Sequence, residues 1–269
     1  MLTLSVYHAD GQLVKAHSAD APHLAFKEYV YQPGDYITLT VDTVPAFYAV
    51  KFDEAFEESL VYLTEKNYCY DIVLDEELRR AFSPKTFAGE RHYLTARPAK
   101  AEEICRRRNL ALNPHDQKDC TGVFPHAYAN VETRNDSTFF ARNVIDGMVA
   151  NESHGSFPYQ SWGINQQVDA ALTLDFGREV LIDELGLVLR GDYPHDSFWT
   201  QITVEFSDGS QVNIYPTDTL NEQKFEIPRK KSTKIILKNL IKNFDESPFP
   251  ALTELTVYGF ESDFDTLLA

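Results

Sequence analysis

Hydrophobic and polar residues alternate in short segments along most of the chain, and a period of two is the signature of β-strands. Examples in the first part are "LTLSVYHA", "DYITLTVD" and "SLVYLTE". After about residue 108 the alternation resumes in "AALTLDFG", "LIDELGLVLR", "TQITVEFSDGS" and "LTELTVYGFE". The pattern therefore predicts an all-β protein of two β-sandwich, jelly-roll-like domains.

Two segments are expected to be helical. The short "DEELRRAF" from Asp75 predicts a surface turn or two, and "AKAEEICRRRNLAL" predicts a helical connector. In the connector, Glu102 and Glu103 precede Arg106 and Arg107 at helical spacing, so their charges can pair along one face. The expected division is a first domain over 1–98, a connector over 99–108 and a second domain over 109–269.

The composition narrows the classes of partner that this protein is expected to bind. The 269 residues carry a formal net charge of −16, which disfavours nucleic acid and anionic membranes because such partners are held through their phosphates. No run of about eighteen apolar residues is present, so insertion into a membrane is not expected. The start of the chain lacks a basic and then apolar leader, and Cys69, Cys105 and Cys120 have no disulfide or zinc spacing. These features indicate free thiols and a cytoplasmic protein.

Catalytic signatures such as GxSxG, HExxH and GxxxxGK are missing from the sequence. The second half instead contains, in order, "NLALNPHD", "ARNVIDGMVANES", "SWGI", "LTLDFG", "VLIDELGLVLR", "ITVEFSDGS" and "ALTELTVYG". Over residues 109–260 this set resembles the discoidin, or coagulation factor 5/8 C-type, domain of the galactose-binding-like fold. Members of this group include many carbohydrate-binding modules with lectin-like activity. No family resemblance is found for the first half.

The resemblance implies a structural calcium ion at the turn "NVIDG". The side chains of Asp146 and Glu254 would bind it, with further oxygens offered by the residues that match the rest of the family site: Asn143, Met148, Asn151 and Ala251. Calcium takes six to eight oxygen ligands, which two carboxylates and loop carbonyls can supply. In the alternative interpretation, Asp146 caps its own turn and Glu254 is an exposed strand residue or bonds backbone amides.

Two connections are unusually aromatic: "HGSFPYQSWGIN", which starts at His154, and "LRGDYPHDSFWT", which starts at Leu189. A sugar offers C–H faces that stack on aromatic rings and hydroxyls that need polar partners. Non-catalytic carbohydrate binding is therefore predicted, with these candidate residues: His154, Tyr159, Gln160, Trp162, Arg190, Asp192, Tyr193, His195 and Trp199. In the alternative interpretation, the large aromatic rings are buried and fill the core at the end of the sandwich.

Two other functions remain open. Two or three of the loop residues His115, His126, His154 and His195, meeting with Asp116, Asp192 or Asp196, could hold a transition metal that activates water for hydrolysis. A protein-interaction scaffold is the other alternative, in which the segment "YVYQPGDY" of the first domain forms a surface for a homo-oligomer.

Overall fold

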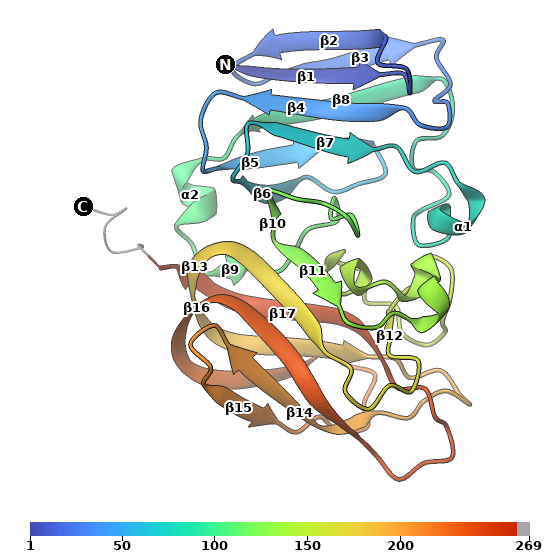
Figure 1. Cartoon of the computed structure of the whole chain (residues 1–269), viewed down its shortest axis with the longest axis vertical. Helices are drawn as coiled ribbons and strands as arrows, with labels where there is room; N and C mark the ends of the chain where they lie inside the picture. Colours follow the sequence, from blue (N-terminus) through green and yellow to red (C-terminus); the bar gives the residue numbers. More distant parts are fainter. Residues whose placement is uncertain (263–269) are drawn as a thin grey trace.

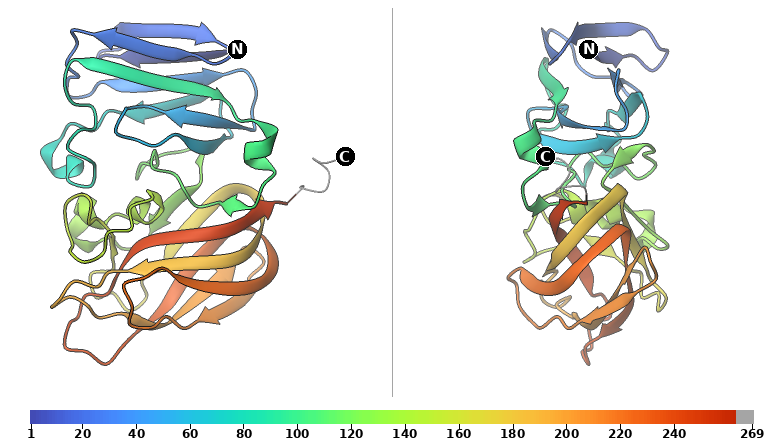
Figure 2. Two further views of the ribbon diagram at one scale, coloured as in Figure 1. Left: turned by 180° about the vertical axis from the view of Figure 1, so that it is seen from behind. Right: turned by 90° about the vertical axis from the view of Figure 1, so that its left-hand side faces the viewer.

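The computed structural model describes residues 1–262. Two antiparallel β-sandwiches stack along the long axis of the molecule (Figure 1), and the two further views in Figure 2 show the same arrangement. The all-β prediction is confirmed. Residues 263–269, which the predicted second domain includes, lie outside the described part. Within that part no helix is both long and apolar enough to cross a membrane.

The first sandwich packs a sheet of order β2-β1-β4-β7 against a sheet of order β10-β6-β5-β8-β3. Its strands are β1 Leu2–Tyr7, β2 Leu13–Ala19, β3 His23–Lys27, β4 Tyr36–Val41, β5 Ala46–Lys51, β6 Ser59–Leu63, β7 Asn67–Asp71, β8 Arg91–Pro98 and β10 Val123–Phe124. Strand β7 illustrates the alternation that the sequence predicts, because it buries Tyr68 and Tyr70 and exposes the residue between them.

Residues 113–124 follow the predicted domain boundary, yet they belong partly to the first sandwich. Strand β10 pairs with β6, and Val123 lies in the first core. His115 is fully buried there, with its ring 5.2 Å from that of Phe52 and 4.8 Å from that of Phe56. Burial lowers the pKa of His115 to about 3, so the imidazole is neutral. The chain thus enters the second sandwich at β9, which pairs with β17, and then returns to complete the first.

The second sandwich is built on one curved set of strands in the order β12-β17-β13-β16-β14-β15, with β11 paired to β13 and β9 to β17. Its strands are β9 Arg108–Asn109, β11 His126–Ala129, β12 Trp162–Gly163, β13 Leu172–Leu189, β14 Trp199–Phe206, β15 Gln211–Ile214, β16 Gln223–Lys242 and β17 Ala251–Glu261. The ladder between β13 and β16 shifts register between Asp175 and Val180. Such breaks bend long strands, so β13 and β16 can wrap one core.

Gly177 explains where β13 bends. Its φ is +67°, and a Cβ built there would lie 2.3 Å from the ring of Phe124. Only glycine tolerates both the left-handed backbone and this close approach.

The helices are short. They are α1 Glu76–Arg79, α2 Ala101–Ile104 and the 3-10 turns η1 Thr133–Asn135, η2 Ser137–Phe139 and η3 Ala141–Ile145. The predicted pairing of Glu102 and Glu103 with Arg106 and Arg107 is wrong, because α2 ends before the arginines. Glu103 instead pairs with Arg97 at 2.7 Å, and Arg107 pairs with Asp183 at 2.7 Å.

The segment "YVYQPGDY" is not an exposed aromatic surface. Tyr31 is buried in the first core, and Tyr29 donates its hydroxyl to Asp35 at 2.6 Å. The main exposed large apolar side chain of this segment is Val30, so the segment offers little apolar surface to a partner.

Candidate functional site

Several connections of the second sandwich meet at one end and enclose a pocket of about 190 Å³. They come from η1 and η2, from the turn after β12, and from the loops that precede β14 and β17. In the left view of Figure 2 the yellow, orange and red connections extend from this end. Of the predicted residues, His154, Arg190 and His195 line the pocket.

A chain of polar contacts, in which Asp192 and Arg190 are buried and His154 is exposed, supports the pocket. Nδ1 of His154 lies 2.5 Å from Oδ2 of Asp192, whose Oδ1 lies 3.0 Å from Nε of Arg190. The second contact is an ion pair without the angle of a hydrogen bond. Arg190 is only 5% exposed, and burial lowers its pKa while Asp192 opposes this change. The predicted loops around His154 and Asp192 therefore do converge.

Arg190 also holds two loops together. Its Nη2 donates to the carbonyl oxygens of His195 and Phe249. These acceptors belong to the connections before β14 and β17, so one guanidinium fixes both of them. A planar donor with several N–H groups is suited to such bridging.

His154 presents a defined atom to the pocket. The Asp192 carboxylate accepts a hydrogen bond, so the Nδ1 of a neutral His154 carries the proton and Nε2 is an acceptor. The His195 ring lies 4.9 Å from that of His154, edge to face, and 5.9 Å from that of Phe249. Phe249 is 40% exposed. An apolar ring beside two imidazoles matches the mixed surface of a sugar.

The pocket also has lining residues that were not predicted, among them Arg134, Asn165, Gln166 and Phe249. Asn165 and Gln166 adopt left-handed φ values of 48° and 58°, and the backbone N–H of Asn165 donates to Thr133 Oγ1 at 3.0 Å. This turn brings two amide side chains to the rim. The only sequence signal for Phe249 is its position between two prolines in a polar loop.

Trp162 and Trp199 are a correction to the predicted site. Both rings are fully buried and pack 6.2 Å apart, and Nε1 of Trp162 donates to the Val131 carbonyl at 2.9 Å. They begin β12 and β14 and close the end of the core, so neither can stack on a ligand. Tyr193, by contrast, is 87% exposed on the loop before β14. Tyr159 is half-buried, and its backbone N–H donates to Ser156.

Gln160 lies away from the pocket and belongs to the predicted calcium turn. Its Nε2 donates to Oδ2 of Asp146 at 2.7 Å, while Glu254 accepts from the N–H of Gly147 at 3.3 Å. Burial raises the pKa of Asp146 to about 6, and burial and the Asp146 carboxylate raise that of Glu254. Two buried carboxylates with raised pKa values fit a divalent cation, which would favour their charged forms.

The other predicted calcium residues already use some of their polar groups. The Asn151 amide donates to the carbonyls of Leu189 and Leu220, and that of Asn143 donates to Ser137 and Ser161. The Ala251 carbonyl accepts from Arg190, and the N–H of Met148 donates to Oδ1 of Asp146. Arg142 also lies 3.7 Å from Asp146. Asp146 and Glu254 are the two predicted ligands whose carboxylates are buried at this turn.

The four loop histidines do not form one cluster. His115 is in the first core and His126 pairs with Asp116 at 2.7 Å, whereas His154 and His195 lie together at the pocket. Within residues 1–262, no three His, Cys, Asp or Glu side chains are grouped so that they could hold a metal. The four-histidine site proposed for a hydrolase is therefore not formed.

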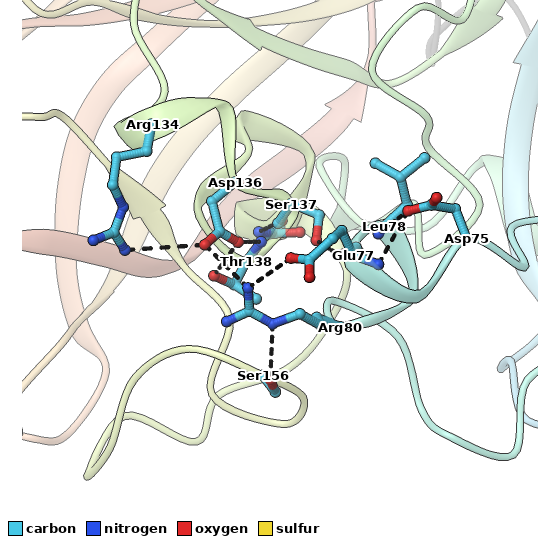
Figure 3. Close-up of polar contacts among 10 residues, drawn as sticks. Asp75, Glu77, Leu78, Arg80, Arg134, Asp136, Ser137, Thr138 and Ser156 are labelled. Carbon is cyan, nitrogen blue, oxygen red and sulfur yellow. Dashed lines mark hydrogen bonds and ion pairs between the residues drawn. The ribbon is translucent and has the colours of Figure 1, made fainter.

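The first sandwich contacts the loop that carries His154 (Figure 3). Arg80, just after α1, pairs with Asp136 at 3.2 Å and donates to Ser156 Oγ at 3.4 Å. Its carbonyl accepts from the N–H of Phe157 at 2.7 Å, and Ser137 Oγ donates to the Glu77 carbonyl at 2.5 Å. The end of α1 thereby ties η2 and the loop together.

No family model matches the sequence, and the search of curated proteins found no match. Solved structures similar to the chain include carbohydrate-binding modules and a lectin domain, which cover a little over half of the chain.

One neighbour is chitosan-binding module 1 from a chitosanase/glucanase of Paenibacillus sp. IK-5, at 18% identity and a TM-score of 0.39 over 56% of this chain and 99% of that module. Another is a fucose-binding module of Streptococcus pneumoniae, at 15% identity and a TM-score of 0.40 over 57% of this chain and 99% of the module. A third is a family 32 module of C. perfringens NanJ in complex with galactose, at 15% identity and a TM-score of 0.38 over 49% and 91%.

Proposed function

We propose that the chain binds a carbohydrate, without transforming it, in the pocket between the loops of the second sandwich. The observation that carries this proposal is the grouping of His154, His195 and the half-exposed Phe249 around one small pocket, braced by Asp192 and Arg190. The ring offers an apolar face for C–H groups, and the imidazoles and nearby amides offer partners for hydroxyls. A pocket of about 190 Å³ suits one sugar residue.

The lining of the pocket favours binding over hydrolysis. Glycoside hydrolysis uses two carboxyl groups that flank the bond to be broken. In the described part of the chain, the residues that line this pocket include no aspartate or glutamate. Asp192 lies behind the surface and is engaged by Arg190 and His154.

The proposal is tested by titrating the full chain with a panel of mono- and oligosaccharides in a calorimeter. For a sugar that binds, Phe249→Ala is expected to weaken the affinity about tenfold, because a lost aromatic contact costs roughly 1–1.5 kcal/mol. His154→Ala should have an effect of similar or larger size, since a sugar hydroxyl would lose its partner.

Phe244→Ala is the matched control for this test. Phe244 lies on the same loop as Phe249, is fully exposed and does not line the pocket, so its loss should leave sugar affinity unchanged. Failure of every sugar to bind, or equal effects of the two phenylalanine variants, would contradict the proposal.

A structural calcium ion at Asp146 and Glu254 is a second part of the proposal. Calcium should raise the midpoint of thermal unfolding by mass action, and a chelator should reverse the increase. Glu254→Gln should abolish the calcium-dependent increase, because it removes one of two carboxylates. Glu222→Gln, which changes a more exposed carboxylate, is the control. If neither calcium nor the chelator changes the midpoint of thermal unfolding, the result would argue against a bound calcium ion.

A further inference from the structure

A second pocket, of about 110 Å³, lies between the two sandwiches. The first sandwich contributes Phe56, Phe82 and Thr86 to its wall, and the second contributes Arg142, Phe157 and Gln160. This volume is several times the roughly 10–15 Å³ that one water molecule needs. The pocket can therefore hold a small molecule.

Three polar atoms on this wall are buried without a partner: Oγ1 of Thr86, Nε of Arg142 and Oε1 of Gln160. The three residues are all less than 5% exposed. Roughly 90% or more of buried polar groups in proteins have a hydrogen-bond partner. A hydroxyl group held in the pocket could supply the partners that these three atoms lack.

The orientation of these atoms is fixed by their neighbours. Gln160 donates its Nε2 to the Asp146 carboxylate at 2.7 Å, and an amide turned the other way would place two acceptors against each other. Arg142 donates Nη2 to the carbonyl of Pro114 at 3.2 Å and Nη1 to Asn143 at 3.3 Å. Gln160 thus offers an acceptor to the pocket and Arg142 offers a donor.

The charges of the inner wall disfavour an anionic ligand, and the wall includes Asp146, Gly147 and Met148 of the proposed calcium turn. Arg142 lies 3.7 Å from Asp146, so the two buried charges largely offset each other. Glu57 and Glu58 also line the pocket, but they are exposed to water, and Glu58 pairs with Arg97 at 2.5 Å. An anionic ligand would therefore find no unmatched buried cation on this wall, because Asp146 offsets Arg142.

We propose that this pocket between the sandwiches binds a small neutral hydroxylated molecule, a polyol or a single sugar. One hydroxyl group can accept from Nε of Arg142 and donate to Oε1 of Gln160, and Thr86 can do either. The rings of Phe56, Phe82 and Phe157 provide apolar contacts for the carbon skeleton. This site does not rest on the loop pocket, with which it shares no lining residue.

The test is ligand-observed saturation-transfer NMR on the full chain with glycerol, D-glucose and D-galactose, with ammonium and acetate ions titrated separately by calorimetry. Transfer is expected to at least one hydroxylated probe. Thr86→Val should weaken that binding about five- to tenfold by removing one hydrogen bond while keeping the shape of the side chain. Ala81→Leu should abolish it by filling the space, since buried Ala81 also lines the pocket.

Phe249→Ala separates the two sites, because it changes only the loop pocket. Binding that survives Phe249→Ala and is lost in Thr86→Val supports the site between the sandwiches whether or not the loop pocket takes a sugar. Absence of transfer to all hydroxylated probes, binding unchanged in Thr86→Val, or binding of the ions alone would overturn the proposal. Thermal unfolding of each variant verifies that it is folded, and Thr86→Val decides the matter if Ala81→Leu does not fold.

Discussion

Trp199→Ala is expected to lower the free energy of unfolding by about 3–5 kcal/mol, the usual cost of removing a large buried ring. Trp199 is 1% exposed and packs on Trp162 at the end of the second core, so the variant leaves a cavity that the strands cannot fill. Denaturation in urea, followed by tryptophan fluorescence and circular dichroism, measures the change. We expect sugar binding to weaken only through this loss of folded protein.

Tyr193→Ala provides the comparison. The Tyr193 side chain is 87% exposed, so its removal should change the free energy of unfolding by less than about 0.5 kcal/mol. If Trp199→Ala instead kept full stability and lost sugar binding, Trp199 would be a ligand platform and the buried arrangement would be incorrect.

Asp192→Asn should affect both stability and binding. The substitution keeps the shape of the side chain but leaves the buried Arg190 guanidinium without its charge partner, which costs about 3–5 kcal/mol when a buried pair is broken. It also weakens the acceptor that orients His154, so sugar affinity should fall about tenfold. Chemical denaturation and calorimetric titration of the same preparation give the two values.

Asp196→Asn, on the same loop but half-buried, is the matched control and should leave both quantities near those of the natural chain. Unchanged stability in Asp192→Asn would mean that Arg190 does not depend on this carboxylate. An unchanged affinity would mean that the orientation of His154 does not matter for the ligand.

The strands could be predicted from the sequence because their pattern is local. Alternation such as that of β7 reports which side chains face a core, and it needs no knowledge of the neighbouring strand. The sequence does not report which strand lies next to which, so the pairing of β10 with β6 was not foreseen. His115 looked like a loop histidine for the same reason, since its aromatic neighbours come from a distant part of the chain.

The site was only partly predictable. His154, Arg190, Asp192 and His195 could be chosen because polar groups and aromatic rings are dense in their two loops. Whether a ring in such a loop faces the ligand or the core depends on the local backbone conformation, which the sequence pattern does not report. In the structure, the rings of Trp162 and Trp199 face the core. Phe249 sits in a loop with few other signals, and its contacts with Arg190 and with the ring of His195 bring it to the pocket.

The return of residues 113–124 to the first sandwich has a consequence for synthesis on the ribosome. Domains usually fold as units as they emerge, the N-terminal one first. Here the nascent chain cannot supply β10 or His115 until well after residue 98 has left the exit tunnel. The first sandwich therefore cannot be completed until this segment has been synthesised. Until then, the edge of β6 and the rings of Phe52 and Phe56 stay uncovered.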